Sequence, residues 1–261
     1  MKIPILMYHS IGDVSAESRF TLPTVLFEQQ MRTLKDLKYH VVNLDDAIAA
    51  LEGTSVLAGK SVAITFDDGF QDTFENAVPV LRGFGFTATF FLVSQLMGRS
   101  SAWMEREGYP SAHLMNWANA RELLRDGFVL GSHSKTHPSL KLLEDAAICD
   151  EIDGSKRDLE DQLGVPIRYF AYPYGHLDDR ARDVVERSGY VAACSTQSGF
   201  NNVSTDRWGL RRLEINKHDS MRMFARSLTF GQNHMRLTEE LNYYIRQALG
   251  RIHNKGASFG A

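Results

Sequence analysis

The sequence predicts an α/β protein, a distorted (β/α) barrel of about seven strands with a C-terminal helical extension. Three observations predict this fold. Short runs rich in β-branched and apolar residues alternate with amphipathic stretches along most of the chain. The links between them are short, as between parallel strands and their connecting helices. About seven such units in 261 residues fit a barrel better than an open sheet.

The predicted elements follow one another in a regular order. Strands are expected at residues 3–8, 40–43, 61–66, 87–93, 128–131, 169–172, 190–194 and 208–215. Helices are expected at residues 23–37, 45–51, 73–84, 117–125, 144–163 and 178–188. Glycine follows several of these helices, for instance at Gly85 and Gly189, and glycine is typical of helix ends. A polar connection that contains a tryptophan occupies residues 97–113.

The C-terminal part of the chain differs in pattern and in charge. Residues 237–252 carry apolar side chains at every third or fourth position, which predicts an amphipathic helix. We therefore expect a barrel domain at residues 1–228 and a helical extension at residues 229–261. From Arg207 onward the chain has ten Lys or Arg against four Asp or Glu. This basic end is either a solvated helix packed on the barrel or a surface that contacts a membrane or a lipid-linked substrate.

Composition and motifs exclude several functions. A net charge of −3, and basic residues without regularly interleaved aromatic ones, argue against nucleic-acid binding. The sequence has neither a Gly-x-Gly-x-x-Gly nor a P-loop pattern for nucleotides, and no Gly-x-Ser-x-Gly of a serine hydrolase. No apolar stretch approaches the roughly 20 residues of a membrane-spanning helix. The N-terminal apolar run is too short for a signal peptide, so we predict a cytoplasmic protein.

Two adjacent carboxylates, Asp67 and Asp68, follow the predicted strand at residues 61–66 and precede Gly69. In a regular strand they would point to opposite faces, but a turn at the glycine allows both to line one pocket. Like charges so close favour either a bound cation or a protonated carboxyl group. An isolated Asp-Asp-Gly sequence is typical of a turn, so a function depends on partner motifs elsewhere.

A pair of histidines, His133 and His137, follows the predicted strand at residues 128–131. Side chains spaced by four lie on one face of a helical turn, where both imidazoles can bind one metal ion. Two histidines and one carboxylate leave coordination positions open, which is typical of a catalytic metal site.

A turn formed by Pro173, Tyr174 and Gly175 follows the predicted strand at residues 169–172. Such a turn fixes the backbone, and one of its N–H groups can point at a substrate oxygen. The three motifs therefore lie at the same kind of strand end, and together they indicate a catalytic site there.

These motifs resemble those of a known family. Residues 65–69 (Thr-Phe-Asp-Asp-Gly), 133–137 (His-Ser-Lys-Thr-His) and 172–175 (Tyr-Pro-Tyr-Gly) are similar to the first three motifs of the polysaccharide deacetylases of carbohydrate esterase family 4. Residues 6–9 (Leu-Met-Tyr-His) are similar to the branch that includes poly-N-acetylglucosamine deacetylases. The resemblance implies metal-dependent removal of N-acetyl groups from an amino-sugar glycan or glycan precursor, with release of acetate.

The resemblance also implies roles for individual residues. The expected ligands of a divalent cation are Asp68, His133 and His137. Zn²⁺ is the expected metal, with Co²⁺, Ni²⁺ or Mn²⁺ as alternatives. Asp67 would be the general base that takes a proton from the attacking water, and the backbone N–H of Tyr174 would stabilise the oxyanion. His9 would protonate the departing amine, with His218 as the alternative acid.

One position departs from the family pattern. The third motif usually carries an arginine three residues before its tyrosine, where it orients the base, but this chain has Ala171 there. Arg168 would lie on the opposite face of the strand. Arg211 or Arg212, on the last predicted strand, is therefore the better candidate for holding the base. The residues expected to line the substrate pocket are Pro173, Trp208, Arg211 and Arg212.

Two other functions stay open at this point. Metal, base and oxyanion donor do not define the amine from which the acyl group is removed. The protein is therefore alternatively an amidase acting on a non-sugar C–N bond. The missing arginine at Ala171 also allows a catalytically inactive glycan-binding protein. For the deacetylase, the lack of a visible export signal favours a lipid-linked or nucleotide-linked amino sugar as the substrate.

Overall fold

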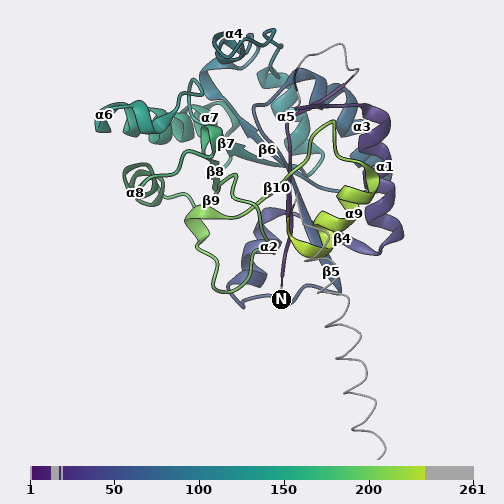
Figure 1. Ribbon diagram of the computed structural model, residues 1–261. Coiled ribbons are helices and arrows are strands. Elements are labelled where there is room, and N and C mark those ends of the chain that lie inside the picture. Colours follow the sequence, from purple (N-terminus) through teal and green to yellow (C-terminus); the bar gives the residue numbers. More distant parts are fainter. Residues whose placement is uncertain (1, 13–17, 19, 233–261) are drawn as a thin grey trace, which may run out of the picture.

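A computed structural model describes residues 2–12, 18 and 20–232 of the chain (Figure 1). Its main sheet has eight strands, and every pairing that the structure describes in it is parallel. The strands are β1 (Ile5–Tyr8), β4 (Tyr39–Val42), β5 (Lys60–Phe66), β6 (Thr89–Leu92), β7 (Val129–Ser132), β8 (Tyr169–Ala171), β9 (Ala192–Cys194) and β10 (Leu213–Glu214). Their spatial order is β10-β1-β5-β6-β7-β8-β9, and β4 pairs with β5. The predicted α/β class is confirmed.

The sheet curves until its two edge strands, β9 and β10, come together. Leu210 forms a parallel bridge with Cys194 at the end of β9. Its N–H donates to the Ala193 carbonyl at 2.8 Å, and its own carbonyl accepts the Ser195 N–H at 2.8 Å. Three residues later β10 begins; it forms the other edge of the sheet and pairs with β1. The segment from Leu210 to β10 therefore closes the distorted barrel, as predicted.

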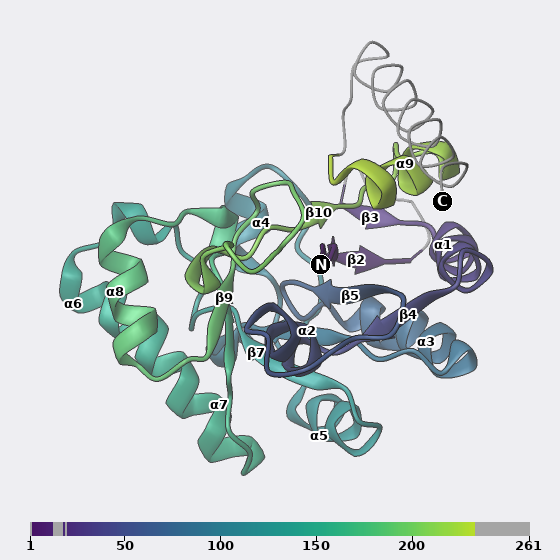
Figure 2. The ribbon, with the colours of Figure 1, turned by 90° about the horizontal axis from the view of Figure 1, so that it is seen from below.

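Helices surround the sheet (Figure 2). They are α1 (Thr24–Asp36), α3 (Val78–Phe84), α5 (Trp117–Arg125), α6 (Asp145–Cys149), α7 (Ser155–Leu163), α8 (Asp179–Arg187) and α9 (Met221–Phe230). Both views place α1 and α3 on one side and α6, α7 and α8 on the other. Helix α2 (Leu44–Leu51) lies at the N-terminal end of the barrel and α4 (Ala102–Arg106) at the opposite end (Figure 1).

Side chains of the strands alternate between the barrel interior and the layer beneath the helices. The interior cluster contains Ile5, Leu44, Ile48, Ala63, Phe91, Tyr169, Ala171, Ala192, Cys194 and Leu210. Alanine is frequent there because the barrel is narrow. Gly131 on β7 faces the same space, since a Cβ atom at this position would lie 2.5 Å from the ring of Phe91. Small residues thus leave room inside the barrel for a few large side chains.

The structure differs from the predicted elements in several places. The helices expected at residues 73–84 and 144–163 contain π-helical segments, Thr73–Ala77 and Asp150–Gly154. The strand expected at residues 208–215 shortens to β10 after a 3₁₀ turn at Arg207–Gly209, because residues 207–210 bend across the barrel to reach β9. Helices α4 and α9 and the short pair β2 (Ser10–Ile11) and β3 (Thr21–Leu22) were not predicted.

The C-terminal expectations fall mostly outside the described residues. This holds for the predicted helix at residues 237–252, so the division into residues 1–228 and 229–261 stays a prediction. Helix α9 spans the expected boundary at residue 228. None of the helices in the described ranges is long and apolar enough to cross a membrane.

Candidate active site

A cavity of about 670 Å³ opens at the C-terminal ends of the strands, the end at which barrels of this kind carry their catalytic groups. Residues that follow four strands line it, namely His9 after β1, Asp67 and Asp68 after β5, His133 and His137 after β7, and Tyr174 after β8. The fold therefore brings together the three motifs predicted from the sequence and the N-terminal histidine.

The two carboxylates share this cavity because the chain turns sharply after β5. Asp68 and Gly69 both adopt a positive φ of 71°. This conformation is uncommon for an aspartate, and it breaks the strand alternation that would separate the two side chains. Both are buried, with 3% of Asp67 and 7% of Asp68 exposed. The expectation that both would line one pocket is met.

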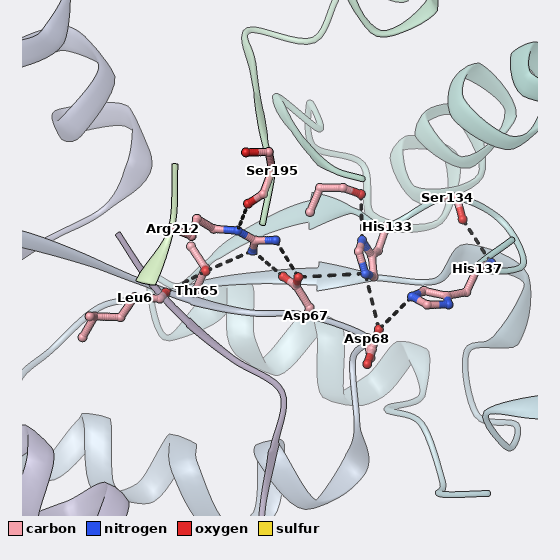
Figure 3. Close-up of polar contacts among 10 residues, drawn as sticks. Leu6, Thr65, Asp67, Asp68, His133, Ser134, His137, Ser195 and Arg212 are labelled. Atoms are coloured by element: carbon pink, nitrogen blue, oxygen red, sulfur yellow. Dashed lines mark hydrogen bonds and ion pairs between the residues drawn. The ribbon is translucent and has the colours of Figure 1, made fainter. Parts of the chain in front are cut away.

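Arg212 makes a bidentate ion pair with Asp67 (Figure 3). Its Nη1 and Nη2 atoms donate to the two carboxylate oxygens at 2.6 and 2.7 Å. The guanidinium group is itself fixed, since Nε donates to the Ser195 carbonyl at 2.9 Å and Nη1 to Thr65 Oγ1 at 3.2 Å. Burial alone would raise the pKa of Asp67, but Arg212 and then His133 outweigh it and hold that pKa below its ordinary value.

The other two arginines considered for this position lie elsewhere. Arg211 is exposed, and its side chain lies against Gly199. Arg168 directly precedes β8 and forms an ion pair with Asp45 of α2, at the N-terminal end of the barrel. Adjacent residues of an extended chain point to opposite sides. Of Arg211 and Arg212, only Arg212 therefore faces the barrel interior.

Three side chains converge as a candidate metal site. The Nε2 atoms of His133 and His137 lie 3.3 and 3.2 Å from Asp68 Oδ1. The three potential ligand atoms all lie within 4.8 Å of one another, and all three residues are buried. Two ligands that each bind one ion at about 2.0–2.2 Å lie roughly 3.0–3.5 Å apart. The observed spacing and the donor set of one carboxylate and two imidazoles therefore fit a divalent cation.

The first histidine is held by the strand beside it. Its Nδ1 atom lies 2.7 Å from the carbonyl oxygen of Ala171 on β8. A carbonyl can only accept a hydrogen bond, so His133 Nδ1 carries the proton and Nε2 is left with its lone pair toward Asp68. The residue that departs from the family pattern thus contributes through its backbone.

The loop between the histidines is not the helical turn expected from their spacing. Ser134 and His137 have positive φ values of 66° and 58°, and the Ser134 hydroxyl accepts the His137 N–H at 3.0 Å. Glu151 supports the loop from the neighbouring π-helical segment. Its carboxylate accepts the N–H groups of Lys135 and Thr136 at 2.8 and 2.9 Å and the Thr136 hydroxyl at 2.6 Å. Side-chain acceptors, rather than helix geometry, therefore bring the second imidazole to Asp68.

Backbone strain is concentrated in this region. Among the described residues five non-glycine residues have a positive φ, and four of them surround the site: Asp68, Ser134, His137 and Tyr174. Such conformations persist only where neighbouring contacts enforce them, and they are common in functional sites.

The electrostatics of the cluster suit a cation. Burial would raise the pKa of Asp68, but His137 and His133 hold it well below its ordinary value. Burial lowers the pKa of His137. It also acts to lower the pKa of His133, but Asp67 and Asp68 outweigh it and the pKa is raised. Two ionised carboxylates beside one arginine leave a negative charge that a cation can balance.

Aromatic side chains form one wall of the cavity. Trp103 of α4 stacks on the ring of His137, with ring centroids 4.4 Å apart and 26° between the planes. Tyr174 meets the same imidazole edge-on at 4.7 Å. Sequence reasoning assigned no role to Trp103 or to Glu151, because the first lies in an irregular connection and the second in a helical stretch, neither of which has a motif.

The remaining predicted residues have different places. His9 lines the cavity beside Phe20, whereas His218 is exposed and does not line it. Trp208 is packed in the layer under the helices, and Pro173 is buried. Of the four residues expected to line the substrate pocket, Pro173, Trp208 and Arg211 do not line the cavity, and Arg212 lies behind Asp67.

Comparisons with known proteins agree with this architecture. A family model described as Polysaccharide deacetylase matches residues 55–193. The chain is 27% identical over 214 residues to YxkH of Bacillus subtilis (strain 168), which is 82% of this chain and 71% of that protein. It is 24% identical over 255 residues to the poly-beta-1,6-N-acetyl-D-glucosamine N-deacetylase of Escherichia coli (strain K12), covering 85% of this chain but 38% of that protein.

A solved structure extends the similarity to the whole barrel. The deacetylase PplD of Streptococcus pyogenes, solved in complex with acetate, superposes with a TM-score of 0.77 and 26% sequence identity. The match covers 88% of this chain and 98% of PplD. This chain and PplD therefore share the predicted barrel fold.

Proposed function

The chain belongs to the polysaccharide deacetylase family, and we propose that it removes N-acetyl groups from an amino-sugar glycan by metal-dependent hydrolysis, releasing acetate. One observation carries this proposal. The buried triad of Asp68, His133 and His137 lies directly beside a second carboxylate, Asp67, that a buried arginine holds ionised. A cation site and a fixed base are the two groups that hydrolysis of an unactivated amide requires.

The triad would hold the metal, and Zn²⁺ is the metal we propose, with Co²⁺, Ni²⁺ or Mn²⁺ as alternatives. Once bound, a divalent cation polarises the amide carbonyl and lowers the pKa of water. Asp67 takes the proton of the attacking water, because Arg212 keeps its carboxylate ionised and fixed in position. His9, which also lines the cavity, returns a proton to the departing amine. The backbone N–H of Tyr174 stabilises the oxyanion.

The charges in the cavity bear on the substrate. Five carboxylates line it, and its described lining includes no lysine or arginine: the acids are Asp67, Asp68, Asp72, Glu107 and Glu214. Such a lining favours a neutral glycan over a phosphate-linked sugar at the reacting position. We therefore propose a polymer of N-acetylglucosamine, for which the similarity to the Escherichia coli enzyme suggests β-1,6 linkage. Contact of the basic C-terminal part with a membrane stays a prediction.

The inactive glycan-binding alternative depended on Ala171. Because Arg212 reaches Asp67 from the last strand, the lack of an arginine at position 171 does not leave the carboxylate without its partner. The hydrolytic function is therefore preferred over a binding function.

The proposal is tested by measuring acetate release from N-acetylglucosamine oligomers and from simple non-sugar amides. We expect release from the oligomers, its loss with a chelator and its return with added metal. His9→Gln should reduce the rate, whereas His218→Gln, the same change at an exposed histidine outside the cavity, should not. Release from the simple amides alone would identify an amidase. Binding of the oligomers without any acetate from metal-loaded protein would overturn the proposal.

A further inference from the structure

The two histidines of the triad are held in different ways. His133 has a hydrogen-bonded partner for Nδ1, the carbonyl of Ala171 at 2.7 Å. The Nδ1 atom of His137 is buried and has no hydrogen-bond partner in the described part of the chain. A metal-binding histidine usually donates its second N–H to an acceptor, which sets the direction of the ring. Something else must orient the imidazole of His137.

Contacts with two aromatic rings, one stacked and one edge-on, take that place. The indole of Trp103 covers one face of the His137 imidazole, with centroids 4.4 Å apart and an angle of 26°. Tyr174 closes on the same ring at 63°. Trp103 is 3% exposed and cannot swing away, because Phe70, Val93 and Leu114 pack around it. The stack fixes the plane of the His137 ring, and in the observed orientation Nε2 points to Asp68 at 3.2 Å.

We propose that Trp103 is a positioning residue for the metal site and orients His137 by stacking instead of by a hydrogen bond. This inference rests on the metal-dependent function proposed above. It also links substrate and metal, since Met104, Glu107 and Tyr109 from the same segment as Trp103 line the cavity. The segment that lines the cavity therefore also packs against His137, the second imidazole ligand.

The experiment compares metal affinity in variants at two positions of one apolar cluster. Trp103→Leu keeps an apolar side chain but has no flat ring, and Trp103→Phe keeps a ring. Leu114→Ala is the matched control, because Leu114 packs in the same cluster but does not line the cavity. The dissociation constant for Zn²⁺ is measured by competition with a chromogenic chelator, and the thermal stability of each metal-free protein is measured alongside.

We expect Trp103→Leu to weaken Zn²⁺ binding by about 10–100-fold, the usual effect of losing a group that orients a ligand. Trp103→Phe should stay within about tenfold of wild type, because a ring contact is retained. Leu114→Ala should lower the melting temperature and leave the dissociation constant unchanged. Equal Zn²⁺ affinity in wild type and Trp103→Leu would overturn the inference, and so would a loss in Leu114→Ala as large as that in Trp103→Leu.

Fluorescence gives a second readout that does not depend on activity. Zn²⁺ bound at His137 would lie beside the stacked indole, so the emission of Trp103 should change on titration with metal. That change should vanish in Trp103→Phe, although Trp117 and Trp208 remain. Wild type that binds no metal at all would contradict the proposed function, whereas tight binding without a Trp103 signal and with equal affinities would contradict only the role of Trp103.

Discussion

Replacement of Arg212 by methionine should destabilise the protein far more than the same replacement of an exposed arginine. Arg212 is completely buried and is bonded through all three guanidinium nitrogens, to Asp67, Ser195 and Thr65. Methionine fills much of the same volume but leaves the buried Asp67 carboxylate without its bidentate arginine partner. Removing one partner of a buried ion pair costs about 3–5 kcal/mol. We expect a loss in this range for the free energy of unfolding.

The double variant Arg212→Met/Asp67→Asn separates the charge from the packing. With neither charge present, no ion is left unpaired, and the double variant should be more stable than Arg212→Met alone by about 2 kcal/mol. Arg211→Met provides the matched control, because the adjacent exposed arginine should change stability by less than about 0.5 kcal/mol.

The assay is urea unfolding at pH 7, with a chelator in every sample so that metal binding does not contribute to stability. A loss below about 1 kcal/mol for Arg212→Met would refute the reasoning, because it would mean that the carboxylate finds water or another partner. A double variant no more stable than the single one would show that packing, not charge, accounts for the loss.

Two further predictions concern the barrel wall and helix α8. Gly131→Ala should lower the free energy of unfolding by about 1–3 kcal/mol in urea titrations, because its Cβ would lie 2.5 Å from the Phe91 ring; adding Phe91→Leu should restore part of it. Asp178→Ala should cost about 1 kcal/mol, because Asp178 accepts the Ala181 N–H at the start of α8, and Asp178→Asn only a few tenths. Burial would raise the pKa of Asp178, but the Ala181 N–H and Arg180 outweigh it and lower the pKa. The carboxylate's contribution is therefore present above pH about 3.9 and is lost as the pH falls through the lower folded pKa, so wild type and Asp178→Asn should converge once the pH lies below that folded pKa.

The parts of the site that could be predicted share one property. Asp67, Asp68, His133 and Tyr174 lie within three residues after the ends of apolar strands, and parallel strands of a barrel end on one side. The alternation of apolar strands with helices therefore predicts the side of the barrel on which these residues lie.

Other parts depend on contacts between distant segments. The spacing of His133 and His137 suits a helical turn, but Glu151 and the Ser134 hydroxyl make an irregular loop more favourable. The choice between Arg211 and Arg212 depends on how the last strand is registered, and the pairing of Leu6 with Leu213 settles it. A local pattern contains neither kind of information.

The order in which the groups of the site occur along the chain has a consequence for protein synthesis. His9 follows the first strand of the sheet and Arg212 precedes the last, and these two strands lie side by side. A ribosome releases the residues of the cation triad well before it releases Arg212. Until then Asp67 has no arginine partner and the barrel has no closing strand. We therefore expect hydrolytic activity to begin only when synthesis of the barrel is nearly complete, and nascent or truncated chains that end before Arg212 to be inactive.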